Sequence, residues 1–260
     1  MAEITAADVK RLRDMTDLPM MKCKQALQEA GGDIEKAKDV LKRKMKEKFE
    51  ERSVRETKEG RVFIRIADDG SKAAMLEIQC ESAPVAGGAH LATFGEDAVR
   101  QLLEGPGAKS AEELLAQSAT KGPALGEQLE EMATKIGENI KATRVARMDG
   151  PVAGYVHHDG KTGVLFAAEG DKTASPVLRD VAMQIAALRP SVTHVADLDP
   201  AAVKVERDRL SEEARATGKP ENIIEKIVDG RMKNFYVDQG VLVVQPFVKD
   251  EAKTVEKALA

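Results

Sequence analysis

The fold class is decided by residues 60–70, which read GRVFIRIADDG. Apolar residues occupy every second position from Val62 to Ile66, a period of two that indicates a strand with one buried face. The acidic turn at residues 68–70 and the apolar segment at residues 74–79 predict a returning strand. Because the segments on either side have a helical period instead, the sequence predicts an α+β fold.

Residues before this hairpin predict three short helices. Thr5 and Asp8 form a capping-box pattern, residues 16–19 interrupt the first helix, and Pro19 is expected to be the first residue of the second. The Gly31–Asp33 segment supplies a helix stop and a new N-cap. The apolar positions expected to line the bundle are Val9, Leu12, Met20, Cys23, Ala26, Leu27, Ile34, Ala37, Val40 and Leu41.

Residues 42–59, between the bundle and the hairpin, are dominated by charge. They are predicted to form a helical linker exposed to solvent, and the alternative is a basic segment that binds ribosomal RNA. The acids at Glu47, Glu50 and Glu51 are interleaved with the basic residues, which favours the linker.

The pattern of a hairpin followed by a helix occurs twice. A helix-rich segment from about residue 90 to residue 140 follows the first hairpin. Strands are then expected at residues 152–158 and 163–168, joined by a turn at residues 158–161, and a helix at residues 177–188. This repetition indicates a duplicated α+β core.

The last third of the chain is expected to contain an antiparallel helical hairpin. Its first helix spans residues 201–216, and the second starts after Pro220. The apolar seam of the second helix is Ile223, Ile224, Ile227 and Val228. Such a hairpin either projects from the core or makes a dimer contact. A strand at residues 240–248 and the start of a helix at residues 253–260 complete the prediction.

Composition restricts the class of protein. Forty Lys and Arg against 44 Asp and Glu give a net charge of −4, so no overall basic excess indicates a nucleic-acid partner. Aromatic residues are only 3% of the chain, too few for a base-stacking platform, and two cysteines are too few for a disulfide framework or a zinc site. No apolar run approaches the roughly 20 residues that span a bilayer. We therefore expect a cytoplasmic protein without a membrane or specific nucleic-acid partner.

No pattern of catalytic or cofactor-binding residues stands out. Residues 154–162 (GYVHHDGKT) resemble a phosphate-binding loop, but five residues separate the glycines where the motif has four, and the segment lies within a hairpin. His157 and His158 are adjacent, so on a strand they should face opposite sides, one exposed and the other partly buried. Cys23 is predicted to be a packed structural thiol. An enzyme, a metal site and a cofactor are accordingly not expected.

Met20 and Met21 begin the second predicted helix, where two adjacent side chains cannot both face one core. We expect one of them to pack in the core and the other to contact a partner, because methionine adapts to varied surfaces.

Several blocks of sequence, each moderately specific and ordered along nearly the whole chain, together resemble the translation elongation factor Ts family. They are residues 9–16 (VKRLRDMT), 20–27 (MMKCKQAL), 32–37 (GDIEKA), 136–140 (IGENI), 180–187 (DVAMQIAA), 218–221 (GKPE), 224–228 (IEKIV), 230–232 (GRM) and 245–248 (QPFV).

The resemblance implies a domain organisation. It comprises a three-helix, ubiquitin-associated-like N-domain with its charged linker at residues 1–54, and a first core subdomain at residues 55–141. A second core subdomain follows at residues 142–260, with the helical hairpin inserted at about residues 199–236. The hairpin could also hold a homodimer together.

The resemblance also implies an activity. Family members bind elongation factor Tu and accelerate GDP release so that GTP can replace it. The positions here that match the family's contact residues are Leu12, Arg13, Met20 and Met21 in the N-domain, Ile136, Gly137 and Asn139 in the core, and His157 on the second hairpin.

One segment departs from the family. Where members usually read Thr-Asp-Phe-Val, this chain reads Ser82-Ala83-Pro84-Val85. The family's Phe is a wedge that disturbs the GTPase near its magnesium and phosphate site; Pro84 cannot fill an aromatic pocket to that depth, and Ala83 cannot accept a hydrogen bond. Two rivals to exchange therefore remain: a protein that binds the same GTPase without exchange activity, and an RNA-binding protein that uses Lys42–Lys58.

Overall fold

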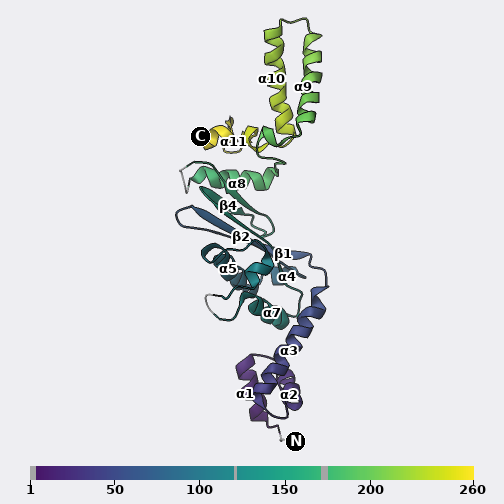
Figure 1. The fold of residues 1–260 in the computed structure, drawn as a ribbon, viewed down its shortest axis with the longest axis vertical. Helices are drawn as coiled ribbons and strands as arrows, with labels where there is room; N and C mark the ends of the chain where they lie inside the picture. The colour runs from purple at the N-terminus through teal and green to yellow at the C-terminus, as the bar shows by residue number, and fades with distance from the viewer. Residues whose placement is uncertain (1–3, 120–121, 171–174) are drawn as a thin grey trace. The chain divides into compact units, whose positions relative to one another are not determined.

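The computed structural model describes residues 4–119, 122–170 and 175–260, which form helices and strands (Figure 1). The predicted α+β class is confirmed. The chain divides into two compact units. The first comprises Met1–Arg65 and Ala74–Arg147, and the second comprises Ile66–Ala73 and Met148–Ala260.

The first unit begins with three helices, α1 (Ala6–Thr16), α2 (Met20–Glu29) and α3 (Ile34–Ser53). Thr5 and Asp8 make the predicted capping box, and the Asp33 carboxylate accepts from the amides of Glu35 and Lys36. Pro19 is the N-cap of α2 and not, as predicted, its first helical residue. The buried residues that hold these helices together are Val9, Leu12, Leu18, Cys23, Ala26, Leu27, Ala37 and Leu41.

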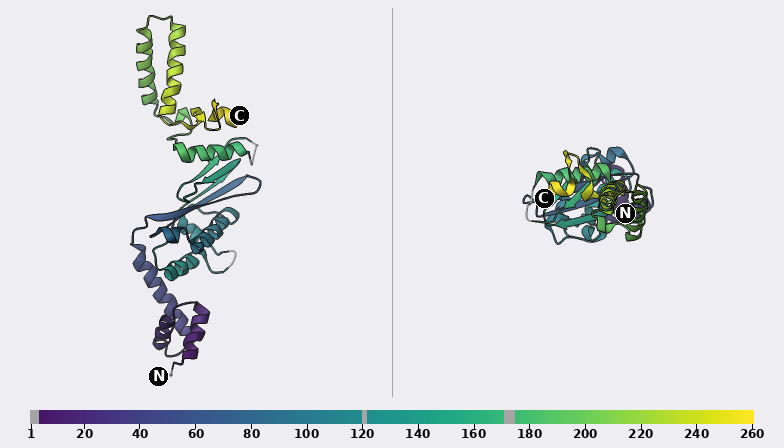
Figure 2. Two further views of the ribbon diagram at one scale, coloured as in Figure 1. Left: turned by 180° about the vertical axis from the view of Figure 1, so that it is seen from behind. Right: turned by 90° about the horizontal axis from the view of Figure 1, so that it is seen from above.

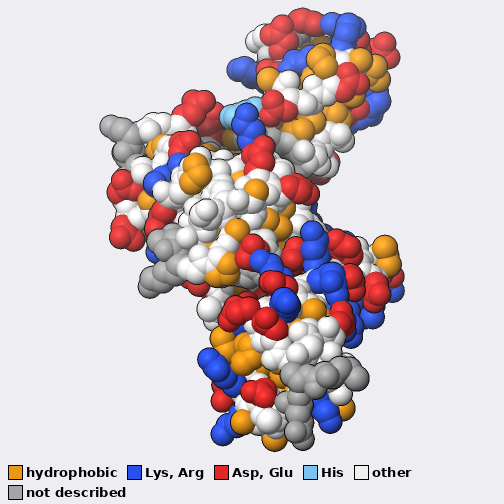
Figure 3. All heavy atoms as spheres, turned by 60° about the horizontal axis from the view of Figure 1, so that its bottom comes forward, with side chains coloured by type: hydrophobic (Ala, Val, Ile, Leu, Met, Phe, Trp, Pro, Cys, Tyr) orange, Lys and Arg blue, Asp and Glu red, His pale blue; other side chains and the backbone are white. Residues whose placement is uncertain are grey.

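The charged segment after the bundle is helical, as predicted, but it is the continuation of α3 to Ser53 and not a separate linker helix. Ion pairs attach α3 to its neighbours: Glu29 of α2 binds Arg43 and Lys44, each at 2.5 Å. The interleaved acids Glu47 and Glu50 are exposed. In the lower part of Figure 3, basic and acidic side chains are intermixed in the same way.

A three-stranded sheet follows, made of β1 (Glu59–Ile66), β2 (Lys72–Cys80) and β3 (Lys141–Asp149) in the order β1-β2-β3. The first hairpin was predicted, whereas β3 was not. Four helices accompany the sheet: α4 (Ala83–Ala86), α5 (Ala89–Glu104), α6 (Ala111–Leu115) and α7 (Leu125–Ile136). A Cβ at Gly95 would lie 2.3 Å from the Phe63 ring, so glycine allows α5 to pack this closely on the sheet.

The second unit contains the antiparallel hairpin β4 (Val152–Val156) and β5 (Gly163–Ala167), in which Gly154 pairs with Leu165. The predicted hairpin is confirmed, and Gly160 supplies a positive φ of 71° in its turn. Helix α8 (Pro176–Leu188) contacts both strands.

The predicted strand at residues 240–248 is mostly wrong. Leu242–Val244 form a 3₁₀ turn, η2, and only β6 (Pro246–Phe247) pairs as a strand, with β7 (Asp250–Thr254). The buried amide of Gln184 on α8 fixes this path, because it donates to the carbonyl of Pro246 (3.1 Å) and accepts from the Val248 amide (3.1 Å). Helix α11 (Val255–Leu259) follows, as predicted, and a short 3₁₀ turn, η1 (Val195–Asp197), lies earlier in the unit.

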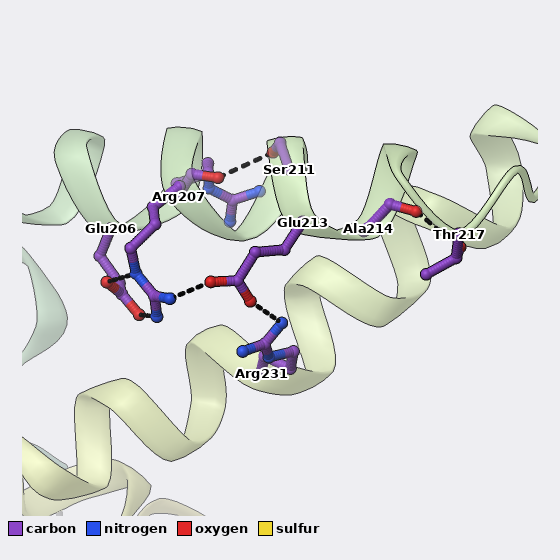
Figure 4. A network of polar contacts seen from close by, with 8 residues as sticks. Glu206, Arg207, Ser211, Glu213, Ala214, Thr217 and Arg231 are labelled. Carbon is purple, nitrogen blue, oxygen red and sulfur yellow. Dashed lines mark hydrogen bonds and ion pairs between the residues drawn. The ribbon is translucent and has the colours of Figure 1, made fainter.

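The predicted helices of the last third are present as α9 (Pro200–Arg215) and α10 (Glu221–Asp238), which lie against each other over their length (Figures 1 and 2). Glu213 of α9 accepts from Arg209 of the same helix and from Arg231 of α10 (Figure 4). The apolar seam beneath this network is Leu210, Ala214, Ile224, Val228 and Met232. None of the described helices is both long and apolar enough to cross a bilayer.

Candidate functional site

The segment Ser82–Val85 lies on the surface, directly after β2. Ser82 is the N-cap of α4, Ala83 and Pro84 are exposed in its first turn, and Val85 packs partly against the core. Proline suits the first turn of a helix, where its missing N–H has no intrahelical acceptor to lose. This short turn therefore presents two small side chains to solvent.

A second candidate segment, at the end of α7, is joined to this turn. Gly137 ends the helix in the left-handed conformation, with a φ of 91°. The carboxylate of the next residue, Glu138, accepts from the amides of Glu81 and Ser82, both at 3.1 Å, and from the Ser82 hydroxyl. One carboxylate thus joins two segments whose residues are 56 and 57 positions apart in the chain.

Asn139 attaches the end of α3 to the same place. Its side chain is only 3% exposed, and its Nδ2 donates to the carbonyls of Ser53 (3.2 Å) and Arg55 (2.7 Å). Its backbone amide donates to the carboxylate of Glu81 at 2.6 Å. Asn139 therefore positions the long helix of the N-terminal bundle relative to the core of this unit.

A cleft of about 900 Å³ lies at the end of α7, within the first unit. Asp17 and Pro19 of the loop between α1 and α2 line it together with Lys22 of α2 and residues of α5 and α7, among them Ile136. Lys135 also lines the cleft, and its Nζ lies 3.7 Å from Oδ2 of Asp17 and 3.0 Å from Oε1 of Glu131. The cleft places the α1–α2 loop close to the end of α7.

The candidates of the N-terminal bundle differ in exposure. Leu12 is 0% exposed within the bundle core, whereas Arg13 is exposed. Met20 is 42% exposed and Met21 65%. The prediction that one of the two methionines packs in the core is wrong, because the face of α2 that meets the bundle begins only at Cys23.

His157 belongs to the second unit. The histidines were expected to point to opposite faces, but both follow the end of β4, and their ring centroids lie only 4.2 Å apart. His157 is partly buried and His158 exposed, as predicted, and the Tyr155 hydroxyl lies 3.0 Å from Nδ1 of His157. Within the described residues no group of three or more His, Cys, Asp or Glu side chains could hold a metal ion.

Sequence reasoning missed the two acids that assemble the site, Glu81 and Glu138. Each follows a feature it did identify: Glu81 comes after a buried strand, and Glu138 after the glycine that ends a helix. The amides that Glu138 accepts from lie at the N-terminal end of α4, where backbone N–H groups have no acceptor within the helix, and a carboxylate is their natural acceptor. Cys80, which precedes Glu81, is buried; burial raises the pKa of its thiol, and the nearby charge of Glu138 raises it further.

Comparisons with known proteins agree on one family. A family model described as elongation factor TS matches residues 81–260. The curated elongation factor Ts of Aquifex aeolicus is 40% identical over 267 residues, covering 98% of this chain and 92% of the relative. The proteins of the same name from Cytophaga hutchinsonii and Methylococcus capsulatus are each 39% identical, covering 100% and 98% of this chain and 94% and 87% of the relatives.

Proposed function

The chain belongs to the elongation factor Ts family, and we propose that it acts in the cytoplasm as a guanine-nucleotide exchange factor. It binds GDP-bound elongation factor Tu and promotes GDP release, without bond chemistry of its own. The observation that carries this proposal is the Glu138 carboxylate, which joins the Ser82–Val85 turn to the end of α7. A factor that acts by contact needs such a surface, because its side chains must meet the partner already in place.

We propose the following organisation for this role. Residues 1–54 form the ubiquitin-associated-like domain, residues 55–141 the first core subdomain, and residues 142–260 the second, with the helical hairpin inserted at about residues 199–236. The exposed Val205 of α9 supports a homodimer contact through that hairpin, which light scattering on the purified protein would detect.

The candidate residues divide by exposure into two roles. Arg13, Met20, Met21, Ala83 and Pro84 are exposed and contact the partner. The partly buried residues Ser82, Val85, Ile136 and Gly137 shape the same surface, and His157 adds a contact from the second unit. Leu12 and Asn139 are buried, so we assign them a positioning role within the bundle and at the end of α3.

Exchange follows from thermodynamic linkage. The protein must bind the nucleotide-free GTPase better than the GDP-bound form, and GDP then weakens the grip of the protein by the same factor. A thousandfold acceleration of release requires about 4 kcal/mol of stabilisation at the release barrier. Several anchors spread over one surface can supply this energy in place of a single aromatic wedge.

The test is stopped-flow release of a fluorescent GDP analogue from elongation factor Tu, with and without the full-length protein. We expect strong acceleration with the natural Ala83-Pro84 sequence. The double variant Ala83→Asp with Pro84→Phe should accelerate release further, because it restores a wedge and an acceptor.

The competing function is binding without exchange, and the small side chains of Ala83 and Pro84 are the observation that favours it. It predicts a stable complex with unchanged GDP release, and activity only in the restored double variant. Met20→Ala combined with Asn139→Ala tests an exposed contact together with a positioning residue: unaffected GDP release in that variant would remove both from the mechanism.

A further inference from the structure

Three basic side chains of the N-terminal bundle gather without an acidic partner. Lys48 and Arg52 lie four residues apart on α3 and therefore on one face of it, and α3 packs against α2, which carries Lys22. Other basic residues of α3 are paired: Lys42 with Glu127, and Arg43 with Glu29. No ion pair involves Lys22, Lys48 or Arg52 in the described part of the chain.

One donor of this cluster is buried without an acceptor within the ranges that the structure describes, and the charges of the cluster act on one another. Nη1 of Arg52 is buried and has no hydrogen-bond acceptor among the described residues. The pKa of Lys22 is lowered, first by burial and then by the positive charges of Lys48 and Arg52. The C-terminal end of the α3 dipole favours Arg52 at its position, but it leaves Nη1 unpaired. Buried donors in folded proteins are rarely left without an acceptor.

We propose that Lys22, Lys48 and Arg52 form a binding site for one phosphate group. A phosphate dianion offers enough oxygens to accept from two ammonium groups and a guanidinium at once, and charge-assisted hydrogen bonds of this kind are strong. The acids Glu47, Glu50 and Glu51 share the same part of α3 and repel an extended polyanion. The ligand is therefore a small phosphate compound and not a nucleic-acid backbone, and Lys22 places the site next to Met21 of the proposed exchange surface.

The experiment measures the melting temperature of the full-length protein as inorganic phosphate is added, with ionic strength held constant by chloride. Ligand that binds only the folded state raises the melting temperature in a saturable way. We expect Lys22→Gln and Arg52→Gln each to weaken the apparent phosphate affinity at least tenfold. Without phosphate, Lys22→Gln should melt at the same or a higher temperature, because it relieves the repulsion.

Lys46→Gln is the matched control, because it removes the same charge from an exposed position of α3 outside the cluster. It should leave the phosphate affinity unchanged. A melting temperature that responds equally to phosphate and chloride would overturn the proposal, and so would an equal loss of affinity in Lys46→Gln. A short RNA that binds through these residues, when inorganic phosphate does not, would assign the cluster to nucleic acid instead.

Discussion

Glu138 is the residue on which the proposed contact surface most depends. Glu138→Gln keeps the size of the side chain but replaces a charged acceptor of three hydrogen bonds by a neutral one. We expect the free energy of unfolding to fall by about 1–3 kcal/mol, since hydrogen bonds to charged groups contribute this much. GDP release should slow by about tenfold, because the Ser82–Val85 turn loses its fixed position.

Urea unfolding and stopped-flow release measure the two effects. Glu96→Gln, at an exposed position of α5, is the control for loss of one carboxylate. Full exchange activity in a destabilised Glu138→Gln variant would show that the turn needs no support from α7.

Glu77 of β2 gives a pH-dependent prediction at the same scale. Its carboxylate binds Nε of Arg144 at 2.6 Å, and this hydrogen bond holds its pKa down, from the ordinary 4.5 to about 2. Because the pKa is lowered in the folded state, the stabilisation is present above pH 4.5 and is lost as the pH falls toward 2. With solvent screening of the exposed Arg144, we expect it to be about 1–2 kcal/mol.

Unfolding free energies of the natural protein and of Glu77→Gln, measured from pH 6 to pH 2, test this expectation. The free energy of unfolding of Glu77→Gln should fall less between pH 4.5 and pH 2 than that of the natural protein, because the contribution of Glu77 is absent. Arg144→Met should reduce this fall in the same way. If the free energy of unfolding still fell steeply with pH in both variants, another group would be responsible for it.

At the scale of elements, the helical hairpin should owe its stability to its seam and not to its ion pairs. The network around Glu213 is exposed and screened by solvent, so Glu213→Gln should have little effect on the stability of the hairpin. Leu210 is buried against α10, and Leu210→Ala should cost about 2–5 kcal/mol. Hydrogen exchange of the α9 and α10 amides reports both effects, and equal loss of protection in the two variants would contradict this ranking.

The elements that sequence predicted best are those with local signals. Thr5, Asp33 and Gly31 mark helix ends by their own side chain or backbone, so the first three helices were predictable. Strand β3 was missed because its Lys and Arg residues obscure its alternation, and only its pairing with β2 makes it a strand. Residues 240–248 carry strand-forming residues, yet the buried Gln184 amide holds their end and a 3₁₀ turn interrupts them.

The candidate site was predictable in its parts but not in its assembly. The helix pattern and the family resemblance both indicated Met20 and Met21, and the resemblance indicated the segments at residues 82–85 and 136–139. The hydrogen bonds of Glu138 and Asn139 that join these segments span more than 50 residues of chain, and no local pattern encodes such pairings. The sequence also did not settle whether Leu12 reaches the surface. Leu12 matches a contact position of the family, yet it lies in the bundle core.

At the scale of the whole molecule, linkage predicts that the two ends of the exchange surface make different contributions. Met21 is exposed on α2 and is one of the proposed contacts, so we expect Met21→Ala to weaken binding to GDP-bound and nucleotide-free elongation factor Tu equally, by about 1–3 kcal/mol. The coupling between GDP and this protein would then be unchanged. Pro84→Phe should instead leave binding to the GDP-bound form nearly unaltered. It should raise the coupling between GDP and this protein by tenfold or more, which is about 1.4 kcal/mol.

Four fluorescence titrations of elongation factor Tu per variant close the thermodynamic cycle. Two measure GDP binding with and without this protein, and two measure binding of this protein with and without GDP. The two routes must give the same coupling factor, which checks the data internally. The double variant separates two arrangements of the surface. If the contributions of Met21 and Pro84 add, the bundle supplies affinity and the turn supplies discrimination. If Met21→Ala alone removes the coupling, the bundle and the core act together. Discrimination between the GDP-bound and nucleotide-free forms then depends on the whole first unit.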